Sequence, residues 1–233
     1  MAERPIYLPR KDGPLLVKTE MVSFQWFPGM AISQKQKSIA SLHEAAVSRD
    51  LCHHPLEISS KSPISTGVAL SAFNLGALTQ KSRRPFTVET AFQSSKVFEL
   101  GGPYRDLLHA TSREAKKDPR IQESGRLVMF DFFGESWALE PKTAFYDWLY
   151  INTLVKNETL VDELVNYDGF TDIEFNPEKS INCQAYSLAL FKSLAARDLL
   201  AEALTSRENF IEIVSTRMVS NAHESTEVQP RLV

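Results

Sequence analysis

The spacing of hydrophobic and polar residues predicts short strands and one helix in the first third of the chain. Residues 1–20 contain three prolines, which exclude a helix, so we expect an extended lead-in there. In the segment 32–50 apolar residues recur at a broken helical spacing, which predicts a helix capped by Ser33. Three short runs have the alternation or the apolar character of strands: 22–27, 56–62 and 67–75.

Helical patterns dominate the rest of the chain. A helix is predicted from its cap at Thr87 to about Leu100, where a Gly-Gly-Pro sequence stops it. A basic helical segment follows as far as Arg120, and the run GRLVMFDFF at 125–133 has the strongest strand pattern. The remaining expected elements are helices from about Pro141 to Val165, an extended segment at 170–176, and helices at 181–204 and 208–215. The pattern predicts a single α+β domain, mostly helical, with a small mixed or antiparallel sheet.

Within this fold we expect three parts. Residues 1–55 form a lead-in strand and helix that pack on the main domain at 56–218. The polar tail at 219–233 is expected to be frayed. The sequence leaves open whether the part at 1–55 completes the main domain or binds a partner.

Composition places the chain among ordinary globular proteins and excludes several classes. Hydrophobic residues make up 43% and charged residues 24% of the 233 positions. Two cysteines are too few for a disulfide scaffold or a thiolate zinc cage, which indicates a reducing compartment. No apolar stretch approaches the ~20 residues that span a bilayer, and the charged start is not a secretory signal. We therefore expect a cytoplasmic protein without membrane contact.

Charge is distributed unevenly along the chain. The net charge of −3 argues against a general nucleic-acid binder. Residues 81–126 hold ten Lys or Arg against six Asp or Glu, whereas residues 128–178 hold two against eleven. This polarity fits a phosphate-accepting face on an acidic body, although two solvated helical faces of opposite sign explain it equally well.

Motifs of several well-known chemistries are absent from the sequence. It contains no Walker loop, no GxGxxG after a strand, no HExxH and no paired CxxC. The run Cys52-His53-His54 does not indicate a metal site, because neighbouring residues of a strand point to opposite faces. We therefore expect neither a metal nor a cofactor.

The most informative segment is PFTVETAFQSSKVF at 85–98. On a helix, Glu89, Gln93 and Lys96 lie at i, i+4 and i+7, in one stripe beside Phe92. A carboxylate, an amide and an ammonium next to an apolar surface suit a polar, sugar-like ligand. By spacing alone, an exposed helix with a dipole-stabilising Glu and a Glu-to-Lys stripe explains the pattern better.

The same segment resembles the motif of the NADAR, or YbiA-like, family, in which a Glu precedes an aromatic-Gln pair and then a Lys and an aromatic residue. The resemblance implies that Glu89 is the essential acidic residue and that Gln93 and Lys96 bind substrate. Other family motifs are similar, in order, to segments across 56–190. They imply further site residues: Ser71 and Phe73 in LSAFNL, Trp137 as a stacking surface in ESWALEPK, and Asp172 with Asn182 in FTDIEFNPEKSINCQA.

The chain departs from the family pattern at three places. Thr90 stands where a His usually follows the essential Glu. The closing Trp-Gly is Phe175-Asn176, and the Leu-Gly after the Asn is Gln184-Ala185.

Across the whole match, segments such as GGPYRDLL and SREAKKDPR are similar to one branch, the NADAR antitoxins found beside DNA ADP-ribosyltransferase toxins of the DarT class. This implies a hydrolase that removes ADP-ribose from guanine in DNA by cleaving an N-glycosidic bond, with Glu89 and Asp172 catalytic. ADP-ribosylated DNA, ADP-ribose and a cognate toxin are the implied partners. Two alternatives stay open: an N-glycosidase of a small nucleotide-like metabolite, and a non-catalytic module that binds ADP-ribose or the toxin.

Two basic groups suit phosphates. Lys61 with the neighbouring serines at 59–60 forms a polar cluster at a strand end, which a surface turn explains equally well. A second group is spaced so that one helix places most of it on one side, where it would face DNA phosphates or a pyrophosphate: Arg113, Lys116, Lys117 and Arg120. A solvated basic helix explains this spacing equally well.

Overall fold

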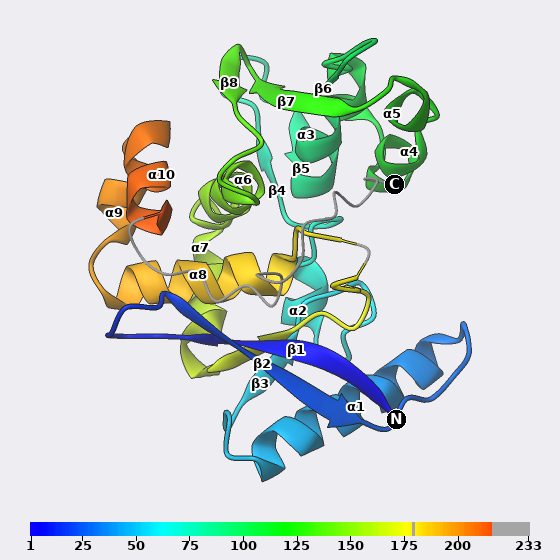
Figure 1. The fold of residues 1–233 in the computed structure, drawn as a ribbon, viewed down its shortest axis with the longest axis vertical. Coiled ribbons are helices and arrows are strands. Elements are labelled where there is room, and N and C mark those ends of the chain that lie inside the picture. The colour runs from blue at the N-terminus through cyan, green and yellow to red at the C-terminus, as the bar shows by residue number, and fades with distance from the viewer. Residues whose placement is uncertain (179, 216–233) are drawn as a thin grey trace.

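The computed structural model describes residues 1–178 and 180–215. They form an α+β fold in which helices join a four-stranded sheet, a three-stranded sheet and a two-stranded hairpin (Figure 1). The predicted single α+β domain is confirmed. The tail at 219–233, predicted to be frayed, lies outside the described residues.

The elements of the described residues have the following bounds. The strands are β1 Ala2–Pro9, β2 Val17–Phe24, β3 Pro55–Glu57, β4 Gly76–Leu78, β5 Pro85–Thr87, β6 Lys96–Phe98, β7 Leu127–Phe132, β8 Glu135–Trp137 and β9 Gly169–Thr171. The α-helices are α1 Ile32–Ser48, α2 Ser65–Ala69, α3 Val88–Ser94, α4 Ser112–Lys117, α5 Arg120–Glu123, α6 Ala144–Leu154, α7 Glu158–Glu163, α8 Gln184–Ala196, α9 Leu200–Ala203 and α10 Arg207–Ser215. Two 3-10 helices are η1 Arg105–His109 and η2 Leu164–Asn166.

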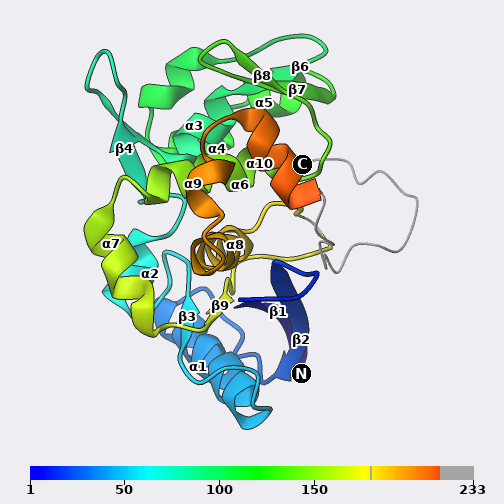
Figure 2. The same ribbon diagram turned by 90° about the vertical axis from the view of Figure 1, so that its left-hand side faces the viewer.

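The four-stranded sheet has the order β2-β1-β9-β3. Strand β1 is antiparallel to both of its neighbours, and β3 is parallel to β9. Alternate residues of β1 face opposite sides: Ile6 and Leu8 pack with α1, and Tyr7 joins the main core. Figure 2 shows α1 on one side of this sheet and α8 on the other. The sheet therefore brings the N-terminal strand beside β9, and Asp172 follows β9 directly.

Helix α3 connects the hairpin β4-β5 to the antiparallel sheet β6-β7-β8. Its Phe92 packs against Phe130 of β7 and against Phe145 and Tyr146 of α6, with ring centroids 5.1 to 6.2 Å apart. The cluster is part of the main hydrophobic core, which also contains α8. This packing fixes α3 against the centre of the fold.

Some predicted elements match the structure closely. Thr87 caps α3, as predicted, and β7 lies within the predicted strand at 125–133. The predicted helix at 32–50 is α1, but Ala31 is its N-cap and no side chain caps it, so the predicted cap at Ser33 is wrong. No helix in the described parts of the chain is both long and apolar enough to cross a bilayer.

Three predicted elements have a different structure. The segment 67–75, predicted as a strand, contains the end of α2 and a turn, because α2 packs closely on β3: a Cβ at Gly67 would lie 2.1 Å from the Glu57 carbonyl oxygen. The helix predicted from Thr87 to Leu100 ends at Ser94, and its last residues pair with β7 as β6. The basic segment is divided among η1, α4 and α5, and the break between α4 and α5 falls at Pro119, which has no amide proton to continue a helix.

Candidate active site

The candidate catalytic carboxylate lies in the first turn of α3. The Thr87 Oγ1 accepts a hydrogen bond from the Thr90 amide at 3.1 Å, and the Thr90 Oγ1 accepts one from the Thr87 amide at 3.0 Å. The Glu89 amide donates to the Ala72 carbonyl at 2.9 Å, which fixes the helix start to the turn after α2. Glu89 is only 7% exposed. The capping box thus holds a buried carboxylate in a defined position.

Gln93 and Lys96 both lie beside Glu89. The Gln93 Nε2 donates to the Glu89 Oε1 at 2.9 Å, while the buried Gln93 Oε1 has no hydrogen-bond partner among the described residues. Lys96 belongs to β6, and its Nζ lies 4.9 Å from the centroid of the Phe92 ring. Burial lowers the pKa of Lys96 to about 8, although the negative charge of Glu89 acts against that shift. Glu89, Gln93 and Lys96 are therefore close together, as the predicted stripe requires, although α3 ends at Ser94.

Tyr146 of α6 is buried next to Phe92. Its ring meets Phe92 edge to face, with centroids 5.1 Å apart. The pKa of its phenol is well above the usual value, chiefly because the group is buried and then because of nearby negative charge, including that of Glu89 and of Asp172. The charges of Glu89 and Asp172 are thus both felt at the Tyr146 phenol.

Asp172 is buried and held by three donors. Its Oδ1 accepts from the amides of Glu174 at 3.0 Å and Phe175 at 3.2 Å, and its Oδ2 accepts from the Gln184 Nε2 at 2.8 Å. Burial raises the pKa of Asp172, and the charge of Glu57 raises it further. A protonated carboxyl is therefore favoured more here than at an exposed aspartate.

Gln184, at the start of α8, connects the parts of the site. Its Nε2 donates to the Ile58 carbonyl at 2.6 Å as well as to Asp172, and its Oε1 accepts from the Ala72 amide at 2.6 Å. The Ala72 carbonyl in turn binds the Glu89 amide. This glutamine, where the family pattern has Leu, joins the two carboxylate-bearing segments.

Glu57 was not predicted as a site residue. It is fully buried at the end of β3; its Oε1 accepts from the Ile173 amide at 2.8 Å and its Oε2 from the Thr171 Oγ1 at 2.6 Å. The Thr171 Oγ1 lies 2.9 Å from the His43 Nε2. Because the Thr171 hydroxyl donates its proton to Glu57, the His43 Nε2 is the donor in its bond to Thr171. Burial lowers the pKa of His43 to about 4, so the imidazole is neutral. A glutamate between two apolar strand residues gives no sequence signal for such a role.

Three other predicted substrate-binding residues lie near these groups or in the adjoining turn. Ser71 is buried, and its Oγ donates to the Val68 carbonyl at 2.8 Å, which indicates a role in the turn. Phe73 is half-buried with the Lys116 Nζ 5.1 Å from its ring centroid. Asn182 is half-buried just before α8.

The predicted stacking surface at Trp137 does not fit the structure. The side chain is only 1% exposed, and its ring packs against Phe145 and Trp148 at centroid distances of 5.5 and 5.0 Å. A ligand has no open ring face to stack on. The buried indole N–H has no hydrogen-bond partner among the described residues.

The predicted phosphate-binding residues have different environments. Arg113, Lys116 and Lys117 are exposed on α4, and Lys61 is half-buried. Arg120, on α5, pairs with Asp106 at 2.7 Å and with Asp118 at 2.9 Å. Its charge is therefore compensated, and the predicted single basic face breaks between α4 and α5.

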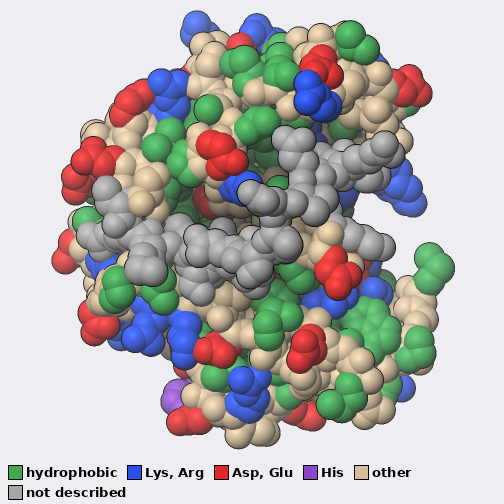
Figure 3. Space-filling model, in the orientation of Figure 1, with side chains coloured by type: hydrophobic (Ala, Val, Ile, Leu, Met, Phe, Trp, Pro, Cys, Tyr) green, Lys and Arg blue, Asp and Glu red, His purple; other side chains and the backbone are tan. Residues whose placement is uncertain are grey.

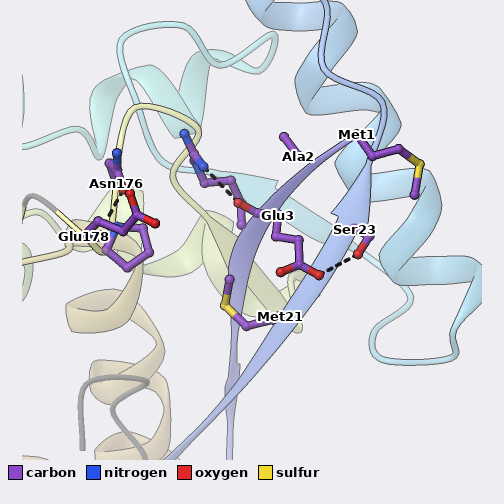
Figure 4. A pocket seen from close by; sticks show the side chains of 9 residues that line it. Met1, Ala2, Glu3, Met21, Ser23, Asn176 and Glu178 are labelled. Carbon is purple, nitrogen blue, oxygen red and sulfur yellow. Dashed lines mark hydrogen bonds between the residues drawn. The ribbon is translucent and has the colours of Figure 1, made fainter. Parts of the chain in front are cut away.

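Two surface cavities lie outside this cluster. One, of about 480 Å³, lies where β1 and β2 meet residues 176–178 (Figure 4). The other, of about 780 Å³, lies beside the hairpin β4-β5. Acidic and basic side chains are interspersed over the face seen in Figure 3. Within residues 1–178 and 180–215, no three His, Cys, Asp or Glu side chains are grouped closely enough to hold a metal ion.

Comparison of the chain with known proteins finds a family match. Residues 2–224 match the family model described as the DarT1-associated NADAR antitoxin. No curated protein matches the chain. The family match covers every residue of the site described above.

Proposed function

The chain belongs to the DarT1-associated NADAR antitoxin family, and on this premise we propose that it is a hydrolase that removes ADP-ribose from guanine in DNA. The reaction would cleave the N-glycosidic bond between the ribose and the base. It would reverse the product of a DNA ADP-ribosyltransferase toxin, which is the antitoxin role that the family name states.

The observation that carries the proposal is the environment of Glu89. The carboxylate is buried, one oxygen is fixed by Gln93, and the ammonium of Lys96 lies beside it. Glycosidic cleavage develops positive charge on the sugar ring, and a fixed carboxylate next to the anomeric carbon stabilises that charge. A surface helix with a charge-paired glutamate would not need this burial.

The proposed reaction is a displacement by water. The water oxygen forms a bond to the anomeric carbon as the bond from that carbon to the guanine nitrogen breaks. The bonding electron pair leaves with the nitrogen, which takes up a proton, and the proton lost by the water passes to Glu89. The products are free ADP-ribose and unmodified guanine.

The neighbouring groups have separate roles in this scheme. Asp172, whose pKa is raised by burial and by Glu57, is the proton donor to the leaving nitrogen. Lys96 and Gln93 orient Glu89, and the unpartnered Gln93 Oε1 is free to accept a hydrogen bond from a ribose hydroxyl. Asn182 contributes an amide to the substrate.

The test compares wild type with Glu89→Gln on an oligonucleotide carrying one ADP-ribosylated guanine, followed by mass. Wild type is expected to release ADP-ribose, and the variant to lose at least about a hundredfold in rate, the range of one acid–base group. Glu99→Gln is the matched control, since Glu99 is exposed and paired with Arg126.

Two outcomes would contradict the proposal. An oligonucleotide left intact by wild type excludes the DNA hydrolase. Full activity of Glu89→Gln excludes the assignment of Glu89, even where hydrolysis is seen.

A further inference from the structure

The cavity beside the hairpin β4-β5 is lined by basic side chains and by no acidic one. We refer to it as the basic groove, and its charged or titratable lining side chains are Arg83, His109 and Lys156, with no acidic residue in the lining. All three are exposed, and none forms an ion pair with a described residue. A groove with positive charge and no compensating carboxylate attracts an anionic ligand.

The groove has a fixed shape. In the hairpin loop the Thr79 amide donates to the Arg84 carbonyl at 2.9 Å, and the Arg84 amide donates to the Thr79 Oγ1 at 3.0 Å. On the other wall the Asn157 Nδ2 donates to the Gly76 carbonyl at 3.0 Å, which ties the end of α6 to β4. The backbone next to Lys156 is therefore held in a defined position relative to the hairpin.

Further positive charge extends beyond the groove. Lys81 and Arg84 are exposed in the loop of the hairpin, which projects at the upper left of Figure 2. At the other end the lining includes Ala110, and α4 with its exposed Arg113, Lys116 and Lys117 begins two residues later. Positive side chains therefore lie on both sides of the groove, with the exposed Glu114 among those of α4.

The basic groove is linked to the candidate active site. Thr87 lines the groove and caps α3, and its Oγ1 lies 2.8 Å from the Ser112 Oγ at the start of α4. Lys116 lies over Phe73, the residue before the groove-lining Asn74, and its charge contributes to lowering the pKa of Lys96. The Thr87–Ser112 contact and the charge of Lys116 thus link the groove with the Glu89 environment.

We propose that the basic groove binds the phosphodiester backbone of the single DNA strand that carries the modified guanine. This inference rests on the proposed function and adds the path of the strand. A single strand is favoured because Glu89 is 7% exposed, so the sugar of a base still stacked in a duplex would not reach it. The exposed Leu78 and Pro85 beside the charges offer apolar surface to unstacked bases.

The experiment measures fluorescence anisotropy of a labelled, unmodified single strand of about 15 nucleotides, near the length that such grooves span. The test variant combines Arg83→Asn with Lys156→Gln. Asparagine is chosen because Arg83 has a φ of 53°, a conformation that Asn tolerates. The control removes two exposed lysines far from the groove, Lys11→Gln with Lys37→Gln.

The double groove variant is expected to bind about tenfold more weakly than wild type, with the slope of log affinity against log salt reduced by about 1.4, or about 0.7 for each lost charge on a single strand. The control pair should change neither by more than about twofold. An equal loss in both variants, or no loss in the groove variant, overturns the groove assignment.

Hydrolysis separates this inference from the proposed function. With the ADP-ribosylated oligonucleotide, the groove variant should raise KM and leave kcat unchanged, because its substitutions lie outside the Glu89 cluster. A wild-type protein that binds the strand through the groove but releases no ADP-ribose would refute the hydrolase and retain the groove. A wild-type protein that releases ADP-ribose, with a groove variant that binds the strand as tightly as wild type, would retain the hydrolase and refute the groove.

Discussion

At the scale of single residues, Lys96 controls the charge next to Glu89. Burial lowers its pKa to about 8, so the ammonium is charged below that pH and neutral above it. We expect kcat/KM to fall as the pH rises through 8, by about tenfold at one unit above that pKa. The measurement is a pH–rate profile on the ADP-ribosylated oligonucleotide.

Substitution of Lys96 by arginine tests whether Lys96 is the group whose titration lowers kcat/KM. Lys96→Arg keeps the positive charge to far higher pH, so the alkaline fall should shift upward or disappear. Asp172 loses its proton in the same direction, and it is unaltered in this variant. If kcat/KM of Lys96→Arg falls at the same pH as that of wild type, the fall is due to Asp172 instead.

The sequence indicates only part of the site. Glu89, Gln93 and Lys96 lie within eight residues of one another, so a short motif contains them all. Glu57 and Tyr146 belong to the cluster through contacts with partners far away in sequence, such as Glu57 with Thr171 and Ile173. Spacing along a chain carries no information on such contacts. The burial of Trp137 among Phe145 and Trp148 is equally long-range.

At the scale of one element, the cap of α3 positions the catalytic candidate. Thr87→Ala removes the acceptor for the Thr90 amide and the contact with Ser112, and it should cost about 1 kcal/mol of stability. Because the first turn carries Glu89, we also expect kcat/KM to fall by about tenfold through misplacement of the carboxylate. Thermal unfolding and steady-state kinetics measure the two effects.

A second capping box in the same chain supplies the control. Thr111 Oγ1 accepts from the Glu114 amide at 3.2 Å at the start of α4, so Thr111→Ala removes the same chemical group from another helix. Its stability loss should be similar, and its kcat should stay at the wild-type level. Equal kinetic losses in both variants would mean that Thr87 acts on stability alone.

Local rules predict how elements begin better than how they end. Thr87 was identified as a cap because a threonine before a helical run has a direct local role. The end of α3 depends on β7: the segment after Ser94 pairs with that strand, which lies about thirty positions further along the chain. Helix α2 was missed for a similar reason, since the packing of Gly67 against Glu57 is absent from the local pattern.

At the scale of the whole molecule, the first 55 residues complete the sheet that carries Asp172. Strand β1 pairs with β9 between Ile6 and Thr171 and between Tyr7 and Phe170, so β9 has neighbours on both sides. The Arg197 guanidinium, beyond α8, also donates to the carbonyl of Arg10 at 2.8 Å. We therefore propose that the lead-in is a structural part of the catalytic domain rather than a separate partner-binding segment.

Removal of residues 1–55 tests this view of the molecule. Without β1, the backbone of β9 loses one ladder and the core loses the buried side chains of Ile6 and Tyr7. Glu57 and Asp172 remain in the shortened chain, yet the strand that positions them is then exposed at an edge. We expect the fragment to lose cooperative thermal unfolding and all hydrolysis, measured by circular dichroism and by ADP-ribose release. A fragment that melts cooperatively and turns over substrate at the full rate would make the lead-in an appendage, and its surface would then be the place to look for the toxin.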